Sequence, residues 1–536
     1  MADSKQPNFV FIITDQHRAD HLGCYGHPVL KTPHIDSIAA RGRKFDKFYV
    51  SCAICMPNRS TLMTGRMPSV HGVRHNGIPL DQGEATFVDL LREQGYSTAL
   101  IGKSHLQNMT NIGAAYGRPE PEEGKKPAPD RFSEARVYNH DDEVYDQETP
   151  ERWDEHSTFD VKTPFYGFET VKLQTGHGDE VGGDYTRWLE SRHENSKNLR
   201  GAENQLDHDY TCPQAWRTAI PEEDYPTSYI TQHSLDYLDE QAKSGGDKPF
   251  FMMMSYPDPH HPFTPPGKYW DMYKPEDMVI PDSFHTNTAP PPNVAWAHER
   301  RESGAQVTTS QSLFALAEEQ HLREALALTC GMISMIDDSI GQVLAKLNEL
   351  GMADNTVVVF TTDHGDLLGD HQLILKGPIH YHGLIRVPFI WADTPDRASA
   401  GSSAALSGTV DIAQTILDRA GLDPYYGIQG RSLLPEIGGA EDQGSGAALV
   451  EQEEPRPYFG LKQPIRLRTL VTERYRMSIY HGVDWGEIYD LEEDPYEINN
   501  LWDDPDFVAT KAMLMEKLAR EEMAAVDYSP LPLKTA

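Results

Sequence analysis

The feature that most constrains the fold of this chain is an alternation of short apolar runs with stretches of helical periodicity. Strand-length apolar runs occupy residues 8–14, 97–102, 250–255, 356–361 and 387–392. Helical stretches lie between them, at residues 35–41, 57–64, 87–94, 228–241, 319–350 and 411–420. This alternation is typical of parallel strands joined by helices that cover both faces of a sheet. The sequence therefore predicts an α/β fold with a large, mostly parallel sheet sandwiched by helices.

Two regions depart from this alternation. Residues 107–227 are polar, acidic and rich in Gly, Pro, Tyr and Trp, and they indicate an insertion over one end of the sheet. Beyond residue 421, a Gly/Ala/Ser-rich stretch at 438–448 precedes a strand-like run at 466–480 and a helix over about 505–525. We therefore expect a catalytic α/β domain at 1–421 and a smaller C-terminal α+β domain at 422–536.

Charge and composition limit the partners of the chain. Its 536 residues include 48 Lys+Arg and 82 Asp+Glu, which gives a formal net charge of −34. This charge disfavours nucleic acids and anionic membranes, although a metal ion or local lysines can still attract a small anion into one pocket. No run approaches the roughly 20 apolar residues of a membrane helix. The five cysteines form no disulfide framework and the first residues show no signal-peptide pattern, so we expect a cytoplasmic protein.

The strongest local signal is a C-x-P-x-R motif formed by Cys55, Pro57 and Arg59. We expect Cys55 to lie just before a helix, with Pro57 near the first helical position, where proline is tolerated. The free backbone N–H groups at the start of a helix attract anions. The motif therefore predicts a cysteine beside an anion-binding site.

Two polar pairs follow predicted strands at the points where the strands end. Asp15 and Gln16 follow the first apolar run, and Asp363 and His364 follow the run at 356–361. Open α/β sheets bind ligands at the carboxyl ends of parallel strands, so we expect these four side chains to lie close together. A single aspartate at such a position more often caps a helix. The two pairs together with the cysteine motif favour a site for one divalent cation.

These motifs resemble those of the sulfatase family, a branch of the alkaline phosphatase superfamily. The cysteine motif and its continuation through residues 60–66 resemble the family's signature, and segments 14–18 and 362–365 resemble its two metal segments. Residues 102–105 resemble its G-K-x-H segment, and residues 259–262 resemble its P-H-x-P segment. Further counterparts cover most of the chain outside residues 107–227. The resemblance implies an alkaline-phosphatase-like fold.

The resemblance implies that Cys55 is oxidised after translation to formylglycine, which makes a formylglycine-generating enzyme a partner during maturation. A hydrated aldehyde carries two hydroxyls, so one can attack sulfur and the other can then expel sulfate and restore the aldehyde. This covalent route splits one difficult step into two easier ones. By the same resemblance, Arg59 holds the hydrate and offsets its charge.

Four basic side chains receive roles from the resemblance. Lys103 would bridge the sulfate group and residue 55, and His105 would act as the base that releases sulfate. His260, in the register of the family motif rather than its neighbour His261, would face the leaving-group oxygen together with Lys376. Lys103, His260 and Lys376 are thus also predicted to bind substrate.

The predicted metal ligands are Asp15, Gln16, Asp363, His364 and the oxygen of residue 55. Many sulfatases carry Asp-Asp and Asp-Asn at the two metal pairs, so Gln16 and His364 depart from the commonest version. A nitrogen ligand in place of an oxygen weakens the case for a purely calcium site. The sequence therefore leaves both Ca²⁺ and Mn²⁺ open as the metal cofactor.

The resemblance predicts an arylsulfatase-type hydrolase of small-molecule sulfate monoesters. Independently of the resemblance, we expect a homo-oligomer. The alternative is a phosphonate monoester or phosphodiester hydrolase, because the phosphonate monoester hydrolases share both metal pairs and an asparagine like Asn76. We expect Asn76 to bind substrate in either case. Those relatives carry Tyr and Thr where this chain has Lys103 and His105, which favours the sulfatase. A third alternative is a non-catalytic relative that binds a partner.

Overall fold

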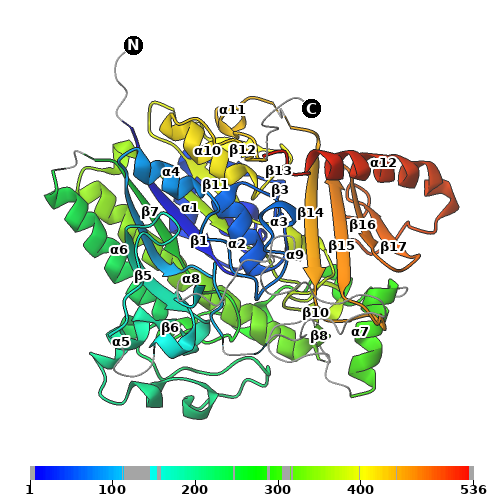
Figure 1. The fold of residues 1–536 in the computed structure, drawn as a ribbon. Coiled ribbons are helices and arrows are strands. Elements are labelled where there is room, and N and C mark those ends of the chain that lie inside the picture. Colours follow the sequence, from blue (N-terminus) through cyan, green and yellow to red (C-terminus); the bar gives the residue numbers. More distant parts are fainter. Residues whose placement is uncertain are drawn as a thin grey trace, which may run out of the picture.

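A computed structural model of the chain contains a large central sheet and a smaller C-terminal sheet (Figure 1). The structure describes residues 6–110, 113, 145–153, 158–245, 248–286, 290–304, 314–315, 318–397, 399–441 and 444–529.

Nine of the described strands form the central sheet, in the order β12-β2-β11-β9-β1-β7-β4-β5-β6. The five adjacent strands from β9 to β5 run parallel, which confirms the predicted mostly parallel sheet. These five are β1 (Asn8–Thr14), β4 (Ser97–Lys103), β5 (Thr170–Thr175), β7 (Phe250–Ser255) and β9 (Thr356–Thr362). The others are β2 (Arg43–Phe45), β6 (Gly182–Gly183), β11 (Phe389–Ala392) and β12 (Gly401–Ser403).

The strand predicted at 387–392 is shorter and runs the other way. β11 begins at Phe389 and pairs antiparallel with β9, so it is not one of the parallel strands that the alternation predicted. Pro388, directly before it, has no backbone N–H to donate to a strand ladder.

Helices cover both faces of the sheet, and the side chains of β1 show the two layers. Phe9, Phe11 and Ile13 pack into one hydrophobic cluster, and Val10 and Ile12 pack into the other. A strand buried on both faces needs apolar residues at successive positions, which explains the continuous apolar run. The first cluster includes α2 (Cys55–Thr64), α4 (Phe87–Glu93) and α10 (Asp411–Ala420), and the second includes α1 (Pro33–Arg41), α6 (Pro226–Lys243) and α8 (Glu319–Glu349).

The segment at 107–227 contributes to the sheet rather than only covering one end of it. β5 and β6 extend the sheet beyond β4, and α5 (Asp184–Glu190) follows them. In β5 the first residues are partly exposed and only the last three are buried. Polar residues therefore alternate with apolar ones there, and no apolar run marks the strand. The domain boundaries at 421 and 422 remain a prediction.

The C-terminal region forms a four-stranded antiparallel sheet in the order β14-β15-β16-β17, with α12 (Val508–Ala524) packed on it (Figure 1). Leu470 faces α12, while its neighbour Val471 belongs to the cluster on one face of the central sheet. The run predicted as one strand at 466–480 is two strands joined by a tight turn. The strands are β14 (Ala447–Glu454), β15 (Ile465–Thr472), β16 (Tyr475–Tyr480) and β17 (Gly486–Asp490).

The remaining elements are short or connect these layers. The strands are β3 (Phe48–Tyr49), β8 (Phe314–Ala315), β10 (Leu373–Ile374) and β13 (Ser407–Gly408). The helices are α3 (Pro68–His71), α7 (Pro292–Glu302), α9 (His382–Ile385) and α11 (Leu434–Ile437). Across the ranges that the structure describes, none of the helices has the length and apolar character needed to cross a membrane.

Candidate active site

The register of the central strands brings the predicted site residues to one edge of the sheet. Ile13 of β1 lies opposite Ser255 of β7 and Thr361 of β9, so the carboxyl ends of these strands are level. Asp15 and Asp363 follow two of these strands, and Lys103 is the last residue of β4. All three side chains are fully buried. Parallel strands of matched length thus concentrate charge at one buried edge.

Cys55 is the first residue of α2, so the prediction that it precedes the helix was wrong by one position. Ile54 occupies the capping position and offers no side-chain hydrogen bond to the helix. Asn76 supplies part of the missing cap, because its Oδ1 accepts from the backbone N–H of Met56 at 3.1 Å. Asn76 therefore lies at the helix start beside Cys55, where it was predicted to bind substrate.

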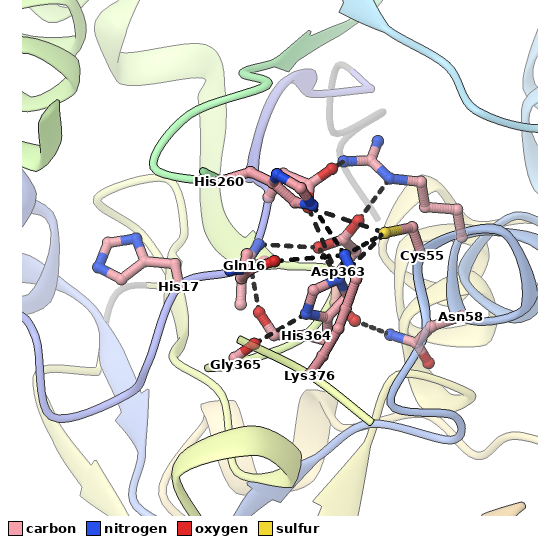
Figure 2. Close-up of polar contacts among 12 residues, drawn as sticks. Gln16, His17, Cys55, Asn58, His260, Asp363, His364, Gly365 and Lys376 are labelled. Carbon is pink, nitrogen blue, oxygen red and sulfur yellow. Dashed lines mark hydrogen bonds and ion pairs between the residues drawn. The ribbon is translucent and has the colours of Figure 1, made fainter. Parts of the chain in front are cut away.

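The thiol of Cys55 lies between two nitrogen groups. Its Sγ is 3.1 Å from His364 Nε2 and 3.1 Å from Lys376 Nζ, and 3.9 Å from Asp15 Oδ1 (Figure 2). Burial and the Asp15 charge raise the pKa of this thiol, but Lys376 and His364 outweigh them and the pKa is lowered.

The other fully buried cysteines show the opposite shift. Burial raises the pKa of Cys212 and of Cys330 to about 12, and it raises the pKa of Cys52 as well. An inert core cysteine behaves in this way because burial disfavours the thiolate. Cys55 is therefore the reactive position among these four cysteines.

Four candidate metal ligands lie together at this edge. Ligand atoms of Asp15, Cys55, Asp363 and His364 all lie within 4.8 Å of one another. His364 donates through Nδ1 to the carbonyl oxygen of Gly365 at 2.8 Å, so its Nε2 faces the cluster. This second hydrogen bond is the usual way in which a metal-binding imidazole is oriented. The donor set fits one divalent cation.

Gln16, the remaining predicted ligand, presents its amide oxygen to the same cluster. Its Nε2 donates to a carboxylate oxygen of Asp366 at 2.6 Å, and its Oε1 accepts from Lys376 Nζ at 3.3 Å. An ionised carboxylate accepts hydrogen bonds but cannot donate them, so the contact with Asp366 fixes the Gln16 amide with its nitrogen toward Asp366. The amide oxygen thereby faces Lys376 and the metal cluster (Figure 2).

Arg59 contacts residues at the ends of four strands, β1, β4, β7 and β9. Its Nε donates to Asp363 Oδ2 at 2.7 Å, and its Nη1 donates to Ser255 Oγ at 3.0 Å and to the carbonyl oxygen of Lys103 at 3.3 Å. Its Nη2 lies 3.5 Å from Asp15 Oδ2. Arg59 thus contacts both carboxylates of the cluster directly, and it offsets their charge rather than touching the Cys55 thiol.

Lys103 forms an ion pair with Asp15, the other carboxylate of the cluster. Burial raises the pKa of Asp15, but the charges of Lys103, Arg59 and Lys376 outweigh burial and hold this pKa well below its usual range. Asp15 is therefore ionised at neutral pH and available as a ligand.

Lys376, which contacts the Cys55 thiol, also contacts His260. Lys376 Nζ is 2.8 Å from His260 Nε2, and burial together with neighbouring positive groups holds the pKa of His260 well below its usual range. Negative charge on Cys55 and Asp15 outweighs the effect of burial on Lys376 and raises its pKa. The lysine is therefore the charged partner of this pair.

His177 is a residue of this site that the sequence motifs did not identify. It follows the carboxyl end of β5, lies with Nε2 2.7 Å from Lys103 Nζ, and stacks on the His260 ring at 3.6 Å between centroids. The rule that located Asp15 and Asp363 at strand ends would have found it. The sequence does not reveal this strand end, because β5 has no apolar run and lies in the segment interpreted as an insertion.

His105 occupies the loop after β4 in a left-handed backbone conformation, with φ of 55°. Its backbone N–H and those of Leu106 and Gln107 all donate to the carboxylate of Glu148, at 2.8 to 3.0 Å. Burial, with Lys103 and Arg59 nearby, holds the pKa of His105 well below its usual range. Its Nδ1 is buried without a hydrogen-bond partner among the described residues. The sequence motifs did not identify Glu148 either.

The structure therefore joins nine of the eleven predicted site residues by direct polar contacts within this edge. These are Asp15, Gln16, Cys55, Arg59, Lys103, His260, Asp363, His364 and Lys376. The other two, Asn76 and His105, lie on the adjoining loops. Asn76 accepts from the backbone N–H of Met56, and the backbone N–H of His105 donates to the carboxylate of Glu148.

Known structures and sequences match this chain over nearly its whole length. The phosphonate monoester hydrolase of Agrobacterium radiobacter superposes with a TM-score of 0.75 at 24% identity, covering 98% of this chain and 97% of that one. An arylsulfatase of Clostridium perfringens is 27% identical over 530 residues, which is 96% of this chain and 95% of that protein. The multifunctional alkaline phosphatase superfamily protein PehA of Trinickia caryophylli is 28% identical over 525 residues, covering 94% and 92%.

Two family descriptions match the chain and together cover most of it. The description "N-sulphoglucosamine sulphohydrolase, C-terminal" matches residues 369–524, and the description "Sulfatase" matches residues 7–422. The second match includes every residue of the edge described above. The chain therefore belongs to the sulfatase family.

Proposed function

We propose that this chain hydrolyses sulfate monoesters of small molecules, as an arylsulfatase-type enzyme with formylglycine at position 55 and one Ca²⁺ or Mn²⁺. The observation that carries the proposal is the environment of Cys55. Cys55 begins a buried helix, its thiol pKa is lowered, and it belongs to a cluster of candidate metal ligands. Lys376 contacts the thiol, and Lys103 pairs with Asp15 of the same cluster. A non-catalytic binding protein has no use for this arrangement.

The residues fit the two groups that the family uses. Asp15, Gln16, Asp363, His364 and residue 55 would hold the metal ion, which neutralises charge on the nonbridging oxygens of the substrate when bound. The formylglycine supplies the nucleophile. Arg59 keeps both carboxylates oriented, because it contacts Asp363 at 2.7 Å and Asp15 at 3.5 Å.

The charges at this edge favour an anion although the whole chain is acidic. Arg59, Lys103 and Lys376 carry three positive charges against the two negative charges of Asp15 and Asp363. A divalent metal adds to this excess. Buried charge of one sign acts more strongly than the screened charge of the surface, so one pocket can attract a sulfate monoester.

We assign three side chains to the reacting oxygens. Lys376 lies 3.1 Å from the Cys55 thiol and 2.8 Å from His260, so this pair can reach both residue 55 and an ester oxygen bound beside it. His105 has a buried Nδ1 without a partner, which leaves it free to exchange a proton with a hydroxyl on residue 55. Donors fixed in place before reaction stabilise the developing charge most effectively.

A substrate panel tests the proposal. Rates are measured on aryl sulfates, phosphonate monoesters and phosphodiesters, with the Cys55→Ala protein as the background control. We expect the highest kcat/KM on an aryl sulfate, with the other two classes as weaker side activities. A preference for phosphonate monoesters would overturn the proposal in favour of the alternative.

That alternative, a phosphonate monoester or phosphodiester hydrolase, has its own support. A relative at 28% identity is described as multifunctional, and Gln16 and His364 are the pairing that phosphonate monoester hydrolases share. Lys103 and His105 stand against it, because two basic side chains beside residue 55 suit the charge that develops in sulfate transfer.

Metal removal tests the cofactor part of the proposal. Dialysis against a chelator should remove activity, and reloading with Ca²⁺ or Mn²⁺ should restore it and identify the better ion. Elemental analysis should find one metal per active chain and none in the Asp363→Ala protein. Full activity without any bound divalent ion would refute this part.

A further inference from the structure

Two lysine–histidine pairs lie side by side at the catalytic edge. Lys376 Nζ is 2.8 Å from His260 Nε2, and Lys103 Nζ is 2.7 Å from His177 Nε2. The two imidazole rings stack with centroids 3.6 Å apart and planes 11° apart. Figure 2 shows the first pair reaching toward Cys55. Of the two histidines, His260 was identified by a sequence motif and His177 was not.

The hydrogen bonds fix how each pair is protonated. A lysine ammonium has three N–H donors and no acceptor, so each Nε2 must accept with its lone pair. The Nδ1 of His260 correspondingly donates to the carbonyl oxygen of His261. Two charged imidazoliums at stacking distance would repel each other, which agrees with two neutral rings that accept through Nε2.

The backbone holds His177 over this position. Gly176 and Gly178 on either side have φ of 78° and 55°, a left-handed region that favours glycine. A Cβ at position 178 would lie 2.7 Å from Cγ of Pro262, so only glycine lets this turn approach the segment that carries His260. The side chain of His177 is 17% exposed, whereas Lys103 beneath it is fully buried.

We propose that His177 is a positioning residue that orients the Lys103 ammonium toward residue 55 and the bound anion. Asp15 and His177 accept two of the three N–H groups of Lys103, which leaves the third for an anionic substrate. Asp15, His177 and His260 also have the spacing of a cation site, and the Lys103 ammonium already contacts two of them. This inference rests on the proposed function, because it assigns Lys103 to the substrate.

Matched substitutions separate the acceptor of His177 from its ring. His177→Gln keeps an oxygen acceptor near the position of Nε2, and His177→Phe keeps a flat ring for stacking without an acceptor. We expect His177→Phe to lower kcat/KM on an aryl sulfate about tenfold or more, mostly through kcat, and His177→Gln to stay within about threefold. If His177→Phe does not fold, His177→Asn replaces it, because its shorter amide cannot reach Lys103.

A double-mutant cycle shows whether the effect passes through Lys103. In a Lys103→Met background, His177→Phe should cause no further loss, because the group that it orients is gone. A structural role would instead give a loss of the same size in both backgrounds. Equal activities of the Phe and Gln variants, or additive losses in the cycle, would overturn the inference. Metal content should match the parent in every variant.

Binding of inorganic sulfate gives a readout that does not need turnover. Calorimetry on the metal-loaded protein should show sulfate affinity about tenfold weaker in His177→Phe and nearly unchanged in His177→Gln. A parent that prefers phosphonates but gives the same cycle would overturn the proposed function and leave the role of His177 intact. A parent that hydrolyses no ester and binds no sulfate would overturn both.

Discussion

Two clusters of buried charge in this chain use similar side chains and pair them differently. The C-terminal charge cluster consists of Arg476, Glu487 and Glu497. Arg476 forms an ion pair with Glu497, donates to Ser478 Oγ at 2.8 Å, and lies 3.4 Å from Glu487. Glu487 also accepts from Tyr480, Asn293 and Tyr489, and Glu497 accepts from the backbone N–H of His382.

The catalytic charge cluster consists of Asp15, Arg59, Lys103, Asp363 and Lys376, and its pairing is incomplete. Positive groups outnumber carboxylates, and Arg59 Nη2 and the nearby His105 Nδ1 are buried without hydrogen-bond partners among the described residues. No polar side-chain atom of the C-terminal charge cluster is left in that state within the same ranges.

The difference shows what each cluster does. Buried polar groups are normally paired, and those that are not need an explanation such as a missing ion or ligand. The complete pairing of the C-terminal charge cluster suits a role in stabilising the fold, and the incomplete pairing of the catalytic charge cluster suits the metal ion and anion of the proposed function. Substitutions should therefore reduce stability in the first cluster and activity in the second.

The largest effect is expected at Cys55. Cys55→Ala should reduce turnover to background, about 10⁴-fold or more, because it removes the nucleophile, while the unfolding midpoint stays near that of the parent. In protein made with the maturation enzyme, the peptide that contains residue 55 should be about 18 Da lighter than its thiol form. Mass spectrometry and rates on an aryl sulfate measure both.

Cys52 provides the control for this prediction. It is also fully buried, but burial raises its thiol pKa and no proline follows two residues later. Cys52→Ala should therefore leave kcat/KM within about twofold of the parent. A fully active protein that carries only thiol at position 55 would show that the mechanism is wrong.

The next effect tests the C-terminal charge cluster. Arg476→Met leaves two carboxylates buried without their cation, which should lower the free energy of unfolding by about 3–5 kcal/mol. Activity of the folded protein should stay within about threefold, because no group of the cluster contacts the catalytic edge. Urea unfolding and rates below the transition separate the two quantities.

Arg520 gives the matched control on α12. It pairs with Glu516 at 2.7 Å, but its side chain is 73% exposed, so Arg520→Met should change the free energy of unfolding by less than about 0.5 kcal/mol. If Arg476→Met proved as mild as Arg520→Met, complete pairing would not be what stabilises the C-terminal charge cluster.

A smaller effect distinguishes sulfate from phosphonate chemistry. Lys103→Tyr with His105→Thr removes two basic side chains from the catalytic edge, and the sulfate reaction should lose about 3 kcal/mol of transition-state stabilisation, or roughly a hundredfold in rate. Phosphonate monoester hydrolysis should lose less, so the ratio of the two kcat/KM values narrows or inverts. An unchanged ratio would mean that these two residues do not set the specificity.

Much of this site could be predicted because its signals are local in sequence. Buried parallel strands give continuous apolar runs, and the residues that follow those runs lie at one edge, which located Asp15 and Asp363. The C-x-P-x-R motif located Cys55 and Arg59 in the same way. The class of fold followed from the same alternation.

The residues that were missed depend on contacts between distant segments. His177 follows a strand that is only half buried, so its sequence has no apolar run. Glu148 accepts from backbone N–H groups more than 40 residues earlier. A sequence does not show which backbone groups a side chain will contact. The C-terminal charge cluster was not predicted for the same reason, because Arg476 and Glu497 lie in different elements.

The smallest expected effect concerns Glu148, whose burial raises its pKa to about 7 although three backbone N–H groups oppose this shift. The folded protein therefore binds this proton more tightly than the unfolded chain, where the pKa is near 4.5. The contribution of Glu148 to stability is then fully present below about pH 4.5 and is lost as the pH rises to about 7. Relative to Glu148→Gln, the free energy of unfolding of the parent should fall over this range by up to about 3 kcal/mol.

Activity should show the opposite trend, because only the ionised carboxylate accepts freely from all three backbone N–H groups that hold His105. The parent should exceed Glu148→Gln in kcat/KM by about tenfold above pH 8, and the ratio should shrink below pH 6, where protonated Glu148 resembles glutamine. Glu349→Gln, at a side chain that is 67% exposed, is the control and should change neither quantity. A ratio that stays constant from pH 5.5 to 8.5 would show that Glu148 does not hold His105 through its charge.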